Sequence, residues 1–358
     1  MSFLIAVTEL INYILYSVLS GYVALQFVSG DRKPTSKVSK KYILLTLLGI
    51  YVCSLGPVAQ VISYFSESVG FTLATYSVLT DFQVGRAWII TGFLSVFFWI
   101  TILLKGSKYI QAILLLLMVL TVGYGSHIAS LSFLGGLFAH STHFLAVTLW
   151  TGILIHVAWF SNDMQKWSRF LRWFTPFAIF CLIIIFGSGI SLMIYAVEPK
   201  YYISSWILPY GQMLLLKHIS IIPLLLFAFI NGALLKKIQM ASIYNPRPWV
   251  KAEGIFILIA YYFTSIMGTL SPPHEVDFTV KSEGASEWVE WLLGKEILTS
   301  LGIGLRGNSN SMILLVMALL FLVMIYASVK QVKPLAAVFL GISFIFTMYF
   351  GLMFSLTV

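Results

Sequence analysis

Long apolar stretches recur along this chain of 358 residues, and they limit what it can fold into. A transmembrane helix needs about 20 mainly apolar residues to cross roughly 30 Å of hydrocarbon. Stretches of about that length occur at 3–28, 41–65, 86–104, 108–126, 138–160, 171–196, 211–235, 250–271, 311–329 and 334–356. They predict an all-α fold, a polytopic transmembrane helical bundle of about ten helices.

The composition excludes an ordinary soluble protein. Apolar residues make up 59% of the chain and charged residues only 10%, whereas about 25% of a soluble domain is charged. A soluble chain this apolar could not cover its own surface, so lipid must be the missing solvent. The net charge of +9 does not indicate nucleic-acid binding, because the basic residues lie in short loops between apolar stretches.

The basic residues gather in every second loop between the predicted helices. Sixteen of the 22 lie there, namely Arg32, Lys33, Lys37, Lys40, Lys41, Lys105, Lys108, Lys166, Arg169, Arg172, Lys236, Lys237, Arg247, Lys251, Lys330 and Lys333. The positive-inside rule makes these loops cytoplasmic, which places both termini outside. We therefore expect a multi-pass protein of the plasma (inner) membrane of a bacterium.

Five of the six histidines lie near the outer ends of the predicted helices. They are His127, His140, His143, His218 and His274. His140 and His143 open the fifth predicted helix and, being three residues apart, project from nearly the same face. Neutral imidazole suits copper, zinc, nickel or iron, so the cluster predicts a metal site without naming the metal. The alternative is that these are interfacial histidines bonded to loop carbonyls. Only His156 lies far away, roughly 20 Å inward at 1.5 Å per residue.

Methionines narrow the choice of metal. The outer ends of the later helices carry Met193, Met213, Met267, Met312 and Met353. Thioether is a soft ligand that favours Cu(I), although membrane methionines also serve as core filler. Copper, as Cu(I) or Cu(II), is the predicted metal. Its predicted ligands are His127, His140, His143, His218, Met213, Met267 and His274.

The chain carries none of the short motifs of a hydrolase or of a nucleotide-driven pump. GxxxxGK[ST], GxSxG and HExxH are all absent from the sequence. We therefore expect neither an enzyme nor a pump that hydrolyses its own ATP.

One part of the sequence resembles a known family of copper proteins. The run from His143 to Gly152, HFLAVTLWTG, is similar to the His-x6-Trp-x-Gly signature that opens the copper resistance protein D (CopD) domain. Further elements follow in the family's order: Arg169-Phe170, Gly189, Tyr210-Gly211, Lys217, Asn231 and Pro272-Pro273. The resemblance covers about 138–273 and is specific as an ordered set.

The resemblance implies an inner-membrane protein of copper transport or of copper homeostasis and resistance. An external capture site favours import, although an exporter would also need an external release site. The resemblance also implies a copper-related role for His143, and it makes Trp150 and Lys217 characteristic neighbours of that residue. The chain departs from the family in two further helices after residue 310, and no external copper-binding β-domain is recognisable. We therefore expect copper, the lipid bilayer and a separate extracytoplasmic copper-donor protein as partners, and no nucleic acid.

These features divide the chain into four predicted parts. They are 1–137 with helices 1–4, 138–273 as a CopD-like four-helix transmembrane domain, 274–310 as an external loop, and 311–358 with two additional helices. Within the loop, Trp288, Trp291 and Leu298 alternate with charges. They indicate an amphipathic helix that either lies at the membrane interface or covers the end of the bundle.

Two other functions remain open. A membrane b-type cytochrome would hold one outer haem between His143 and His218. Two stacked haems are disfavoured, because His156 has no inner histidine partner and lies roughly 140° around the helix from His143. A non-transporting assembly factor for copper enzymes fits the composition equally well.

Overall fold

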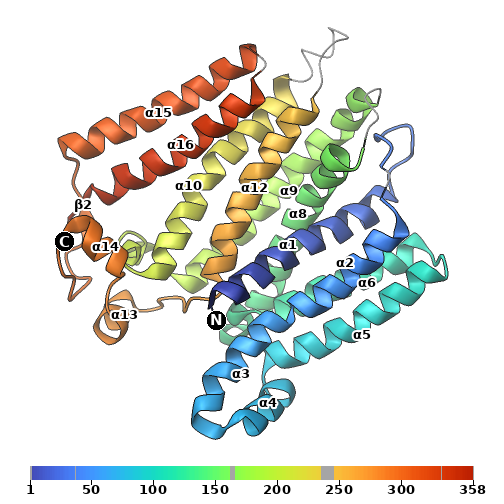
Figure 1. Ribbon diagram of the computed structural model, residues 1–358, viewed down its shortest axis with the longest axis horizontal. Coiled ribbons are helices and arrows are strands. Elements are labelled where there is room, and N and C mark those ends of the chain that lie inside the picture. The colour runs from blue at the N-terminus through green and yellow to red at the C-terminus, as the bar shows by residue number, and fades with distance from the viewer. Residues whose placement is uncertain (1, 37, 162–165, 235–245, 332, 358) are drawn as a thin grey trace. The chain divides into compact units, whose positions relative to one another are not determined.

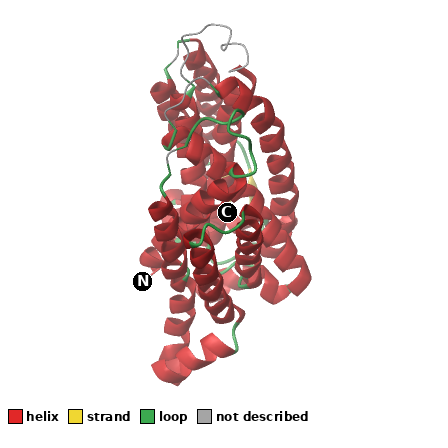
Figure 2. Ribbon diagram, turned by 90° about the vertical axis from the view of Figure 1, so that its right-hand side faces the viewer, coloured by secondary structure: helices red, strands yellow, loops and turns green. Residues whose placement is uncertain are grey.

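The structure is a computed structural model that describes residues 2–36, 38–161, 166–234, 246–331 and 333–357. Helices make up nearly all of its regular secondary structure (Figure 1), and the view in Figure 2 shows them throughout the described chain. The predicted all-α class is confirmed. The chain divides into two compact units, Met1–Leu192 and Met193–Val358, and each is described by itself.

Unit 1 is a helical bundle in which α1 packs along α8. Its helices are α1 Ser2–Leu25, α2 Lys40–Cys53, α3 Leu55–Val69, α4 Phe71–Thr80, α5 Gln83–Leu103, α6 Lys108–Tyr124, α7 His127–Leu131, α8 Phe133–Trp159 and α9 Trp167–Ala196, whose last residues belong to unit 2. Helices α2, α5 and α6 complete the bundle around α1. The core between them is apolar and includes Tyr16, Leu19, Ile43, Phe98 and Met118.

Unit 2 is built from two helix pairs, α10 with α12 and α15 with α16, each running side by side (Figure 1). Its elements are η1 Pro199–Tyr201, η2 Ser204–Ile207, α10 Pro209–Phe229, the π-helical turn η3 Ile230–Leu234, α12 Arg247–Met267, α13 Val276–Glu283, α14 Glu287–Leu293, β1 Gly304–Leu305, α15 Ser309–Lys330, α16 Pro334–Met353 and β2 Leu356–Thr357. The strands form one antiparallel pair, in which Gly304 lies opposite Thr357.

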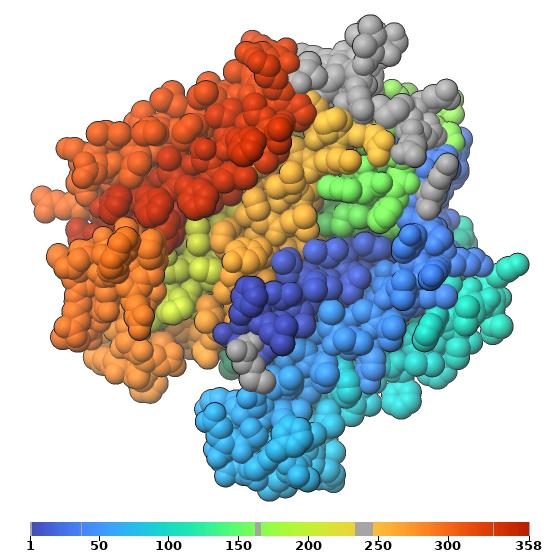
Figure 3. Space-filling view, in the orientation of Figure 1, coloured from blue at the N-terminus to red at the C-terminus, as the bar shows by residue number. Residues whose placement is uncertain are grey.

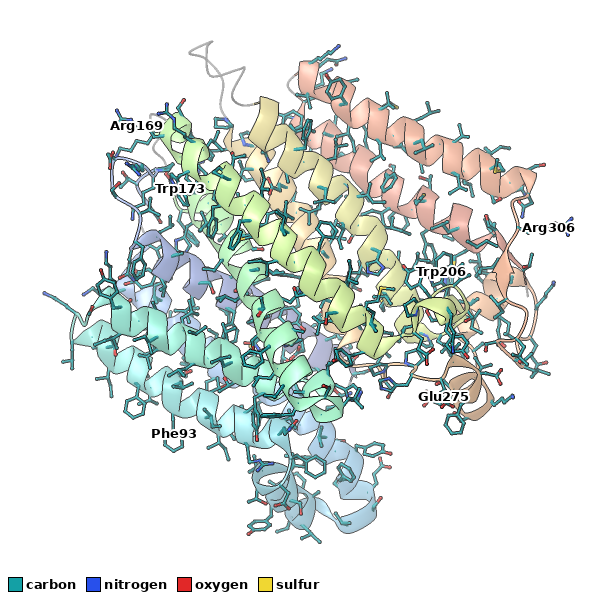
Figure 4. All side chains as sticks on the ribbon, turned by 180° about the vertical axis from the view of Figure 1, so that it is seen from behind. Phe93, Arg169, Trp173, Trp206, Glu275 and Arg306 are labelled. Carbon is teal, nitrogen blue, oxygen red and sulfur yellow. The ribbon has the colours of Figure 1, made fainter. Side chains whose placement is uncertain are left out.

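Nine helical segments of the described chain are long and apolar enough to span a membrane. They correspond to nine of the ten predicted stretches, and the tenth, 108–126, forms the 17-residue helix α6. At 1.5 Å per residue α6 is about 25 Å long. Large apolar side chains such as Phe93 and Ile183 are exposed, and Phe93 points away from its bundle (Figure 4). The protein is therefore a multi-pass membrane protein, and these exposed faces contact lipid.

The loops of unit 1 agree with the predicted alternation of sides. Figure 4 shows Trp173 at the start of α9, where its Nε1 donates to the Arg32 carbonyl over 2.8 Å. The Lys166 ammonium donates to the Gly30 carbonyl over 3.0 Å. The loop after α1 and the segment that begins α9 therefore share one side, as predicted. That this side is cytoplasmic stays a prediction.

Unit 2 shows a similar agreement among its predicted external segments. The Ser286 amide donates to the Ile207 carbonyl over 2.8 Å, and the Arg306 amide donates to the Ser355 carbonyl over 2.7 Å. The segment before α10, the long loop after α12 and the C-terminal residues therefore lie together. All three were predicted to be external.

The fifth predicted helix begins earlier than the sequence indicates. The predicted stretches end at 126 and resume at 138, but α7 occupies part of the interval between them and α8 begins at Phe133. His140 and His143 are therefore the eighth and eleventh residues of α8, and the prediction that they open this helix is wrong. The physical reason is packing: Gly136 brings α8 against the backbone of α7, where any Cβ would overlap.

A short hairpin after α3 was not predicted at all. Helix α4 follows α3 directly, and the turn between them is Gly70 with φ of 82°, a left-handed conformation that favours glycine. Figure 3 shows this hairpin as a lobe that stands out from the rest of unit 1. Tyr64, Phe71 and Tyr76 are exposed on it.

The long external loop contains two short helices, α13 and α14. In α14, the rings of Trp288 and Trp291 stack with centroids 5.1 Å apart. The helix ends at Gly294, which has φ of 64°. A position of this helix at the membrane interface stays a prediction, and so do the four predicted parts of the chain.

Candidate functional site

His143 is held by α9 through one of its ring nitrogens. Its Nδ1 lies 3.0 Å from Ser188 Oγ and 3.2 Å from the Ile185 carbonyl oxygen. Ser188 Oγ donates its own proton to the Ile184 carbonyl over 2.6 Å, so both groups facing Nδ1 are acceptors. In the neutral imidazole Nδ1 therefore carries the proton and Nε2 carries the lone pair. A histidine oriented in this way through a backbone carbonyl is the usual form of a metal ligand.

Gly189 leaves room for this ring. A Cβ at Gly189 would lie 3.3 Å from Cε1 of His143, closer than ordinary van der Waals contact. The glycine and serine of α9 therefore set the position of His143 together, one by its size and the other by its hydroxyl.

His140 and His127 lie near His143 in the chain, but they differ in setting. The His140 ring lies parallel to the ring of Phe144, with centroids 6.4 Å apart. His127 is exposed and begins α7, where Ser126 accepts a hydrogen bond from the Ala129 amide as the helix cap. Among the residues that the structure describes, no three His, Cys, Asp or Glu side chains gather closely enough to hold a metal ion. The predicted copper site stays a prediction.

His218 belongs to unit 2 and pairs with a tyrosine. Its Nδ1 lies 2.7 Å from the hydroxyl of Tyr202, in the segment between η1 and η2. Burial raises the pKa of Tyr202 to about 12, so the phenol stays protonated at neutral pH. For Nε2 of His218 to bind a metal, Nδ1 must carry the ring proton and donate to the tyrosine oxygen.

The remaining predicted ligands also lie in unit 2. Met267 ends α12 and packs against the apolar cluster that includes Val197, Tyr210 and Leu214. Met213 is half-buried on α10, and His274 is exposed in the turn after Pro272-Pro273. The predicted ligands thus divide between the units, with His127, His140 and His143 in unit 1 and Met213, His218, Met267 and His274 in unit 2.

His156 has a structural role in unit 1. It is buried, and its Nε2 donates to the Val18 carbonyl of α1 over 2.9 Å. Beside it, α1 and α8 approach so closely that a Cβ on Gly21 would overlap the Gly152 backbone. The ring thus ties two closely packed helices together.

Sequence reasoning missed a buried amide at the start of α10. The Gln212 amide nitrogen donates to the Trp206 carbonyl, and also to Sδ of Met353 over 3.4 Å. The Tyr349 hydroxyl donates to Gln212 Oε1 and accepts from Trp288 Nε1 over 2.9 Å. This chain of bonds joins α14, α16 and α10. The available signal was a glutamine inside an apolar stretch, because a buried amide needs partners.

Sequence reasoning also missed a buried acid. Glu253 lies in the second turn of α12 with an exposed fraction of 2%, and it accepts a hydrogen bond from the Asn231 amide over 2.7 Å. Asn231 itself was noted only as part of the resemblance. The signal for the acid was a carboxylate inside an apolar stretch, which is costly in a membrane and marks function.

Residues 168–267 match the family model CopD, Copper resistance protein D. These residues form a copper resistance protein D domain. The CopD domain runs from α9 through α12, so it contains Met213, Lys217, His218 and Met267. It also contains both Asn231 and Glu253. No curated protein and no solved structure matches the chain.

The matched range is narrower than the predicted 138–273. It begins after His143 and Trp150, so the His-x6-Trp-x-Gly segment lies outside the CopD domain, and it ends before His274. The match therefore covers α9, α10 and α12 with a copper-resistance family. His143 is linked to the domain through the part of α9 that carries Ser188.

Proposed function

We propose that this protein transports copper across the plasma membrane of a bacterium, with both termini outside and with import as the direction. The observation that supports the proposal is the CopD domain at 168–267. Its membrane-spanning helices carry Met213, His218 and Met267. Imidazole and thioether together make a soft ligand set, which favours Cu(I) over magnesium, calcium or manganese.

The proposed copper ligands lie at the outer ends of the helices. In unit 1 they are His143, with His140 and His127, and in unit 2 they are His218, Met213, Met267 and His274. The support for His143 is its tautomer, because Nδ1 is engaged by two acceptors and the lone pair lies on Nε2. A transported ion must also leave, so we expect two or three ligands at a time and no closed cage.

The ion reaches these ligands from outside, and we propose that an extracytoplasmic copper-donor protein delivers it. Histidine binds both Cu(I) and Cu(II), whereas the thioethers of Met213 and Met267 favour Cu(I). Copper therefore moves along α10 and α12 as Cu(I).

The test is cellular copper in a strain that lacks the protein, complemented with variants at equal abundance in the membrane. We expect wild type to raise copper above the null strain, and His143→Ala and His218→Ala to remove at least half of that increase. His156→Gln is the matched control. It replaces another α8 histidine with a side chain that still donates to the Val18 carbonyl, so it should keep the increase.

Three results would contradict the proposal. Equal loss in His143→Ala and His156→Gln would mean that the histidines act through folding. A stoichiometric haem absorption band in the purified protein, lost in both His143→Ala and His218→Ala, would replace copper with haem and make the protein a cytochrome. Wild-type copper equal to that of the null strain would favour an assembly factor.

A further inference from the structure

Asn231 and Glu253 meet inside unit 2, away from the proposed copper ligands. Their exposed fractions are 5% and 2%. The Asn231 amide nitrogen donates to Glu253 Oε2 over 2.7 Å and to the Trp249 carbonyl over 3.2 Å. Asn231 lies in the π-helical turn η3, and such turns are frequent at functional sites. The pair therefore joins the end of α10 to the start of α12.

The surroundings of the carboxyl group are aromatic. Trp249 and Phe256 lie on the same face of α12 as Glu253, at spacings of four and three residues. Phe227 of α10 stacks on Phe256 with centroids 5.1 Å apart and lies 6.2 Å from Trp249. Phe256 in turn fills the space beside Gly341 of α16, where a Cβ would overlap its ring. These three rings form an apolar contact between α10, α12 and α16.

No basic side chain compensates the acid in the described part of the chain. The helices α10, α12 and α16 carry these basic or other titratable residues besides Glu253: Tyr210, Lys217, His218, Arg247, Lys251, Tyr261, Tyr262 and Tyr349. None of them forms an ion pair or a hydrogen bond with Glu253, whose one described side-chain partner is Asn231. Lys236 and Lys237 lie outside the described residues. An ionised carboxylate here would have a single amide in place of its hydration shell.

Two side-chain atoms of Asn231 and Trp249 have no hydrogen-bond partner among the described residues. They are Asn231 Oδ1 and Trp249 Nε1, and both are buried. Buried polar atoms in native proteins are nearly always satisfied, so an unsatisfied pair beside an acid needs an explanation. The asparagine side chain can turn its amide over, which exchanges the donor nitrogen for the acceptor oxygen. An ionised carboxylate needs the donor, whereas a protonated carboxyl group needs the acceptor.

We propose that Asn231 and Glu253 form a proton-binding site within the membrane. An O–H bond forms on the Glu253 carboxylate with a proton taken from water, and the same bond breaks when the proton returns to water. Asn231 serves both states, since its Nδ2 donates to the carboxylate and its Oδ1 accepts from the carboxylic acid. Because α10 and α12 also carry Met213, His218 and Met267, the site couples copper movement to a proton gradient. This last step rests on the proposed transport function.

The proton site is tested without copper. Infrared difference spectra of the protein in lipid nanodiscs, recorded across a pH titration, report the C=O stretch of protonated carboxyl groups. We expect one band that is lost in Glu253→Gln and moved in frequency in Asn231→Leu. Glu9→Gln is the matched control, because Glu9 is another acid of a membrane-spanning helix, bonded to Tyr13. It should leave that band in place.

Several results would overturn the site. The same carboxyl bands in wild type and in the folded Glu253→Gln variant would show that Glu253 does not titrate. A band that disappears on adding sodium at constant pH would make the ligand a metal cation. Folding is checked by size-exclusion elution, and Glu253→Gln keeps the size of the side chain.

The coupling is tested by copper uptake into proteoliposomes with and without a pH gradient across the membrane. Wild type should respond to the gradient at least several-fold, and Glu253→Gln should take up copper at one rate in both conditions. If wild type moves copper and ignores the gradient, the coupling is wrong although the infrared band stands. If wild type moves no copper at all, the proposed transport function is wrong, and the infrared result still decides the proton site.

Discussion

Two helix contacts differ in the residues that form them. One joins α1 to α8 in unit 1, and the other joins α10 to α12 in unit 2. The first relies on glycine: a Cβ on Gly152 would overlap the Ser17 carbonyl and the Gly21 backbone. A hydrogen bond also crosses it, since His156 donates to the Val18 carbonyl. Small residues that let backbones approach, with hydrogen bonds beside them, are a common way to join membrane helices.

The α10–α12 contact contains large aromatic rings and a buried acid. Phe227 and Phe256 fill it with stacked rings, and Glu253 lies among them with one amide partner. Asn231 Oδ1 and Trp249 Nε1 add two buried atoms that lack partners among the described residues. The first contact stabilises the fold, whereas the second holds groups that a purely structural contact would not keep. Ionisable groups inside a membrane mark function, and this comparison separates the two roles within one chain.

The largest effect is expected from a larger residue in the glycine contact. Gly152→Val should lower stability by about 1–3 kcal/mol or prevent accumulation, because the new side chain must enter backbone space. Gly187→Val is the matched control, since a Cβ at Gly187 meets nothing within 4 Å. The measurement is the temperature at which half of the detergent-solubilised protein is lost from its size-exclusion peak. Similar midpoints for both variants would remove the claim that steric closeness holds α1 to α8.

A smaller and opposite pair of effects is expected from neutral replacements of the two buried titratable groups. His156→Leu should lower stability by about 1 kcal/mol, because the Val18 carbonyl loses a donor. Glu253→Gln should leave stability unchanged or raise it, because a neutral amide carries no cost of burying charge. The same thermal assay compares them. A larger loss for Glu253→Gln than for His156→Leu would make the acid a structural group and break the comparison.

The smallest effect is expected at Asp277, an acid outside the membrane that contrasts with Glu253. Its carboxylate pairs with Lys281 at 2.6 Å and accepts from Thr299 Oγ1 at 2.8 Å and the Ser300 amide at 3.1 Å. These partners, Lys281 first, lower the pKa of Asp277 from its ordinary value of 3.8 to about 2. A lowered pKa means that the contact stabilises the folded loop above about pH 4 and is lost as pH falls toward 2.

The measurement is the amide resonance of Ser300 in serine-labelled protein between about pH 5 and about pH 2. We expect it to shift with a midpoint near that pKa, and Asp277→Asn should abolish the transition. A midpoint at the ordinary aspartate value would mean that these bonds are not made in solution.

The sequence already predicted most of the helices, because length and hydropathy are local properties. The stretch 41–65 corresponds to α2 and α3, although the break at Ser54 is invisible in composition. Where prediction failed, packing had overridden the local signal. The glycines before His140 suggested a loop, yet α8 continues through them because Gly136 packs against α7.

The candidate site was predicted less completely than the fold. Histidines and methionines could be picked out by type, but the orientation of His143 depends on Ser188, which is 45 residues away. Glu253 was readable in principle, since Trp249, Glu253 and Phe256 follow helical spacing. It escaped notice because a charge near the end of an apolar stretch is usually a loop residue. Gln212 escaped because it carries no charge.

The sequence by itself determined that the chain is a multi-pass helical membrane protein with a CopD segment and an alternating charge pattern, because each of these depends on residues close together in the chain. Only the tertiary structure decided which polar groups meet. Asn231 reaches Glu253 across 22 residues, and Tyr349 reaches Gln212 across 137. Hydropathy records how much a residue prefers lipid, but a buried polar group is stabilised by the direction and distance of its partner, and those exist only after the helices have packed.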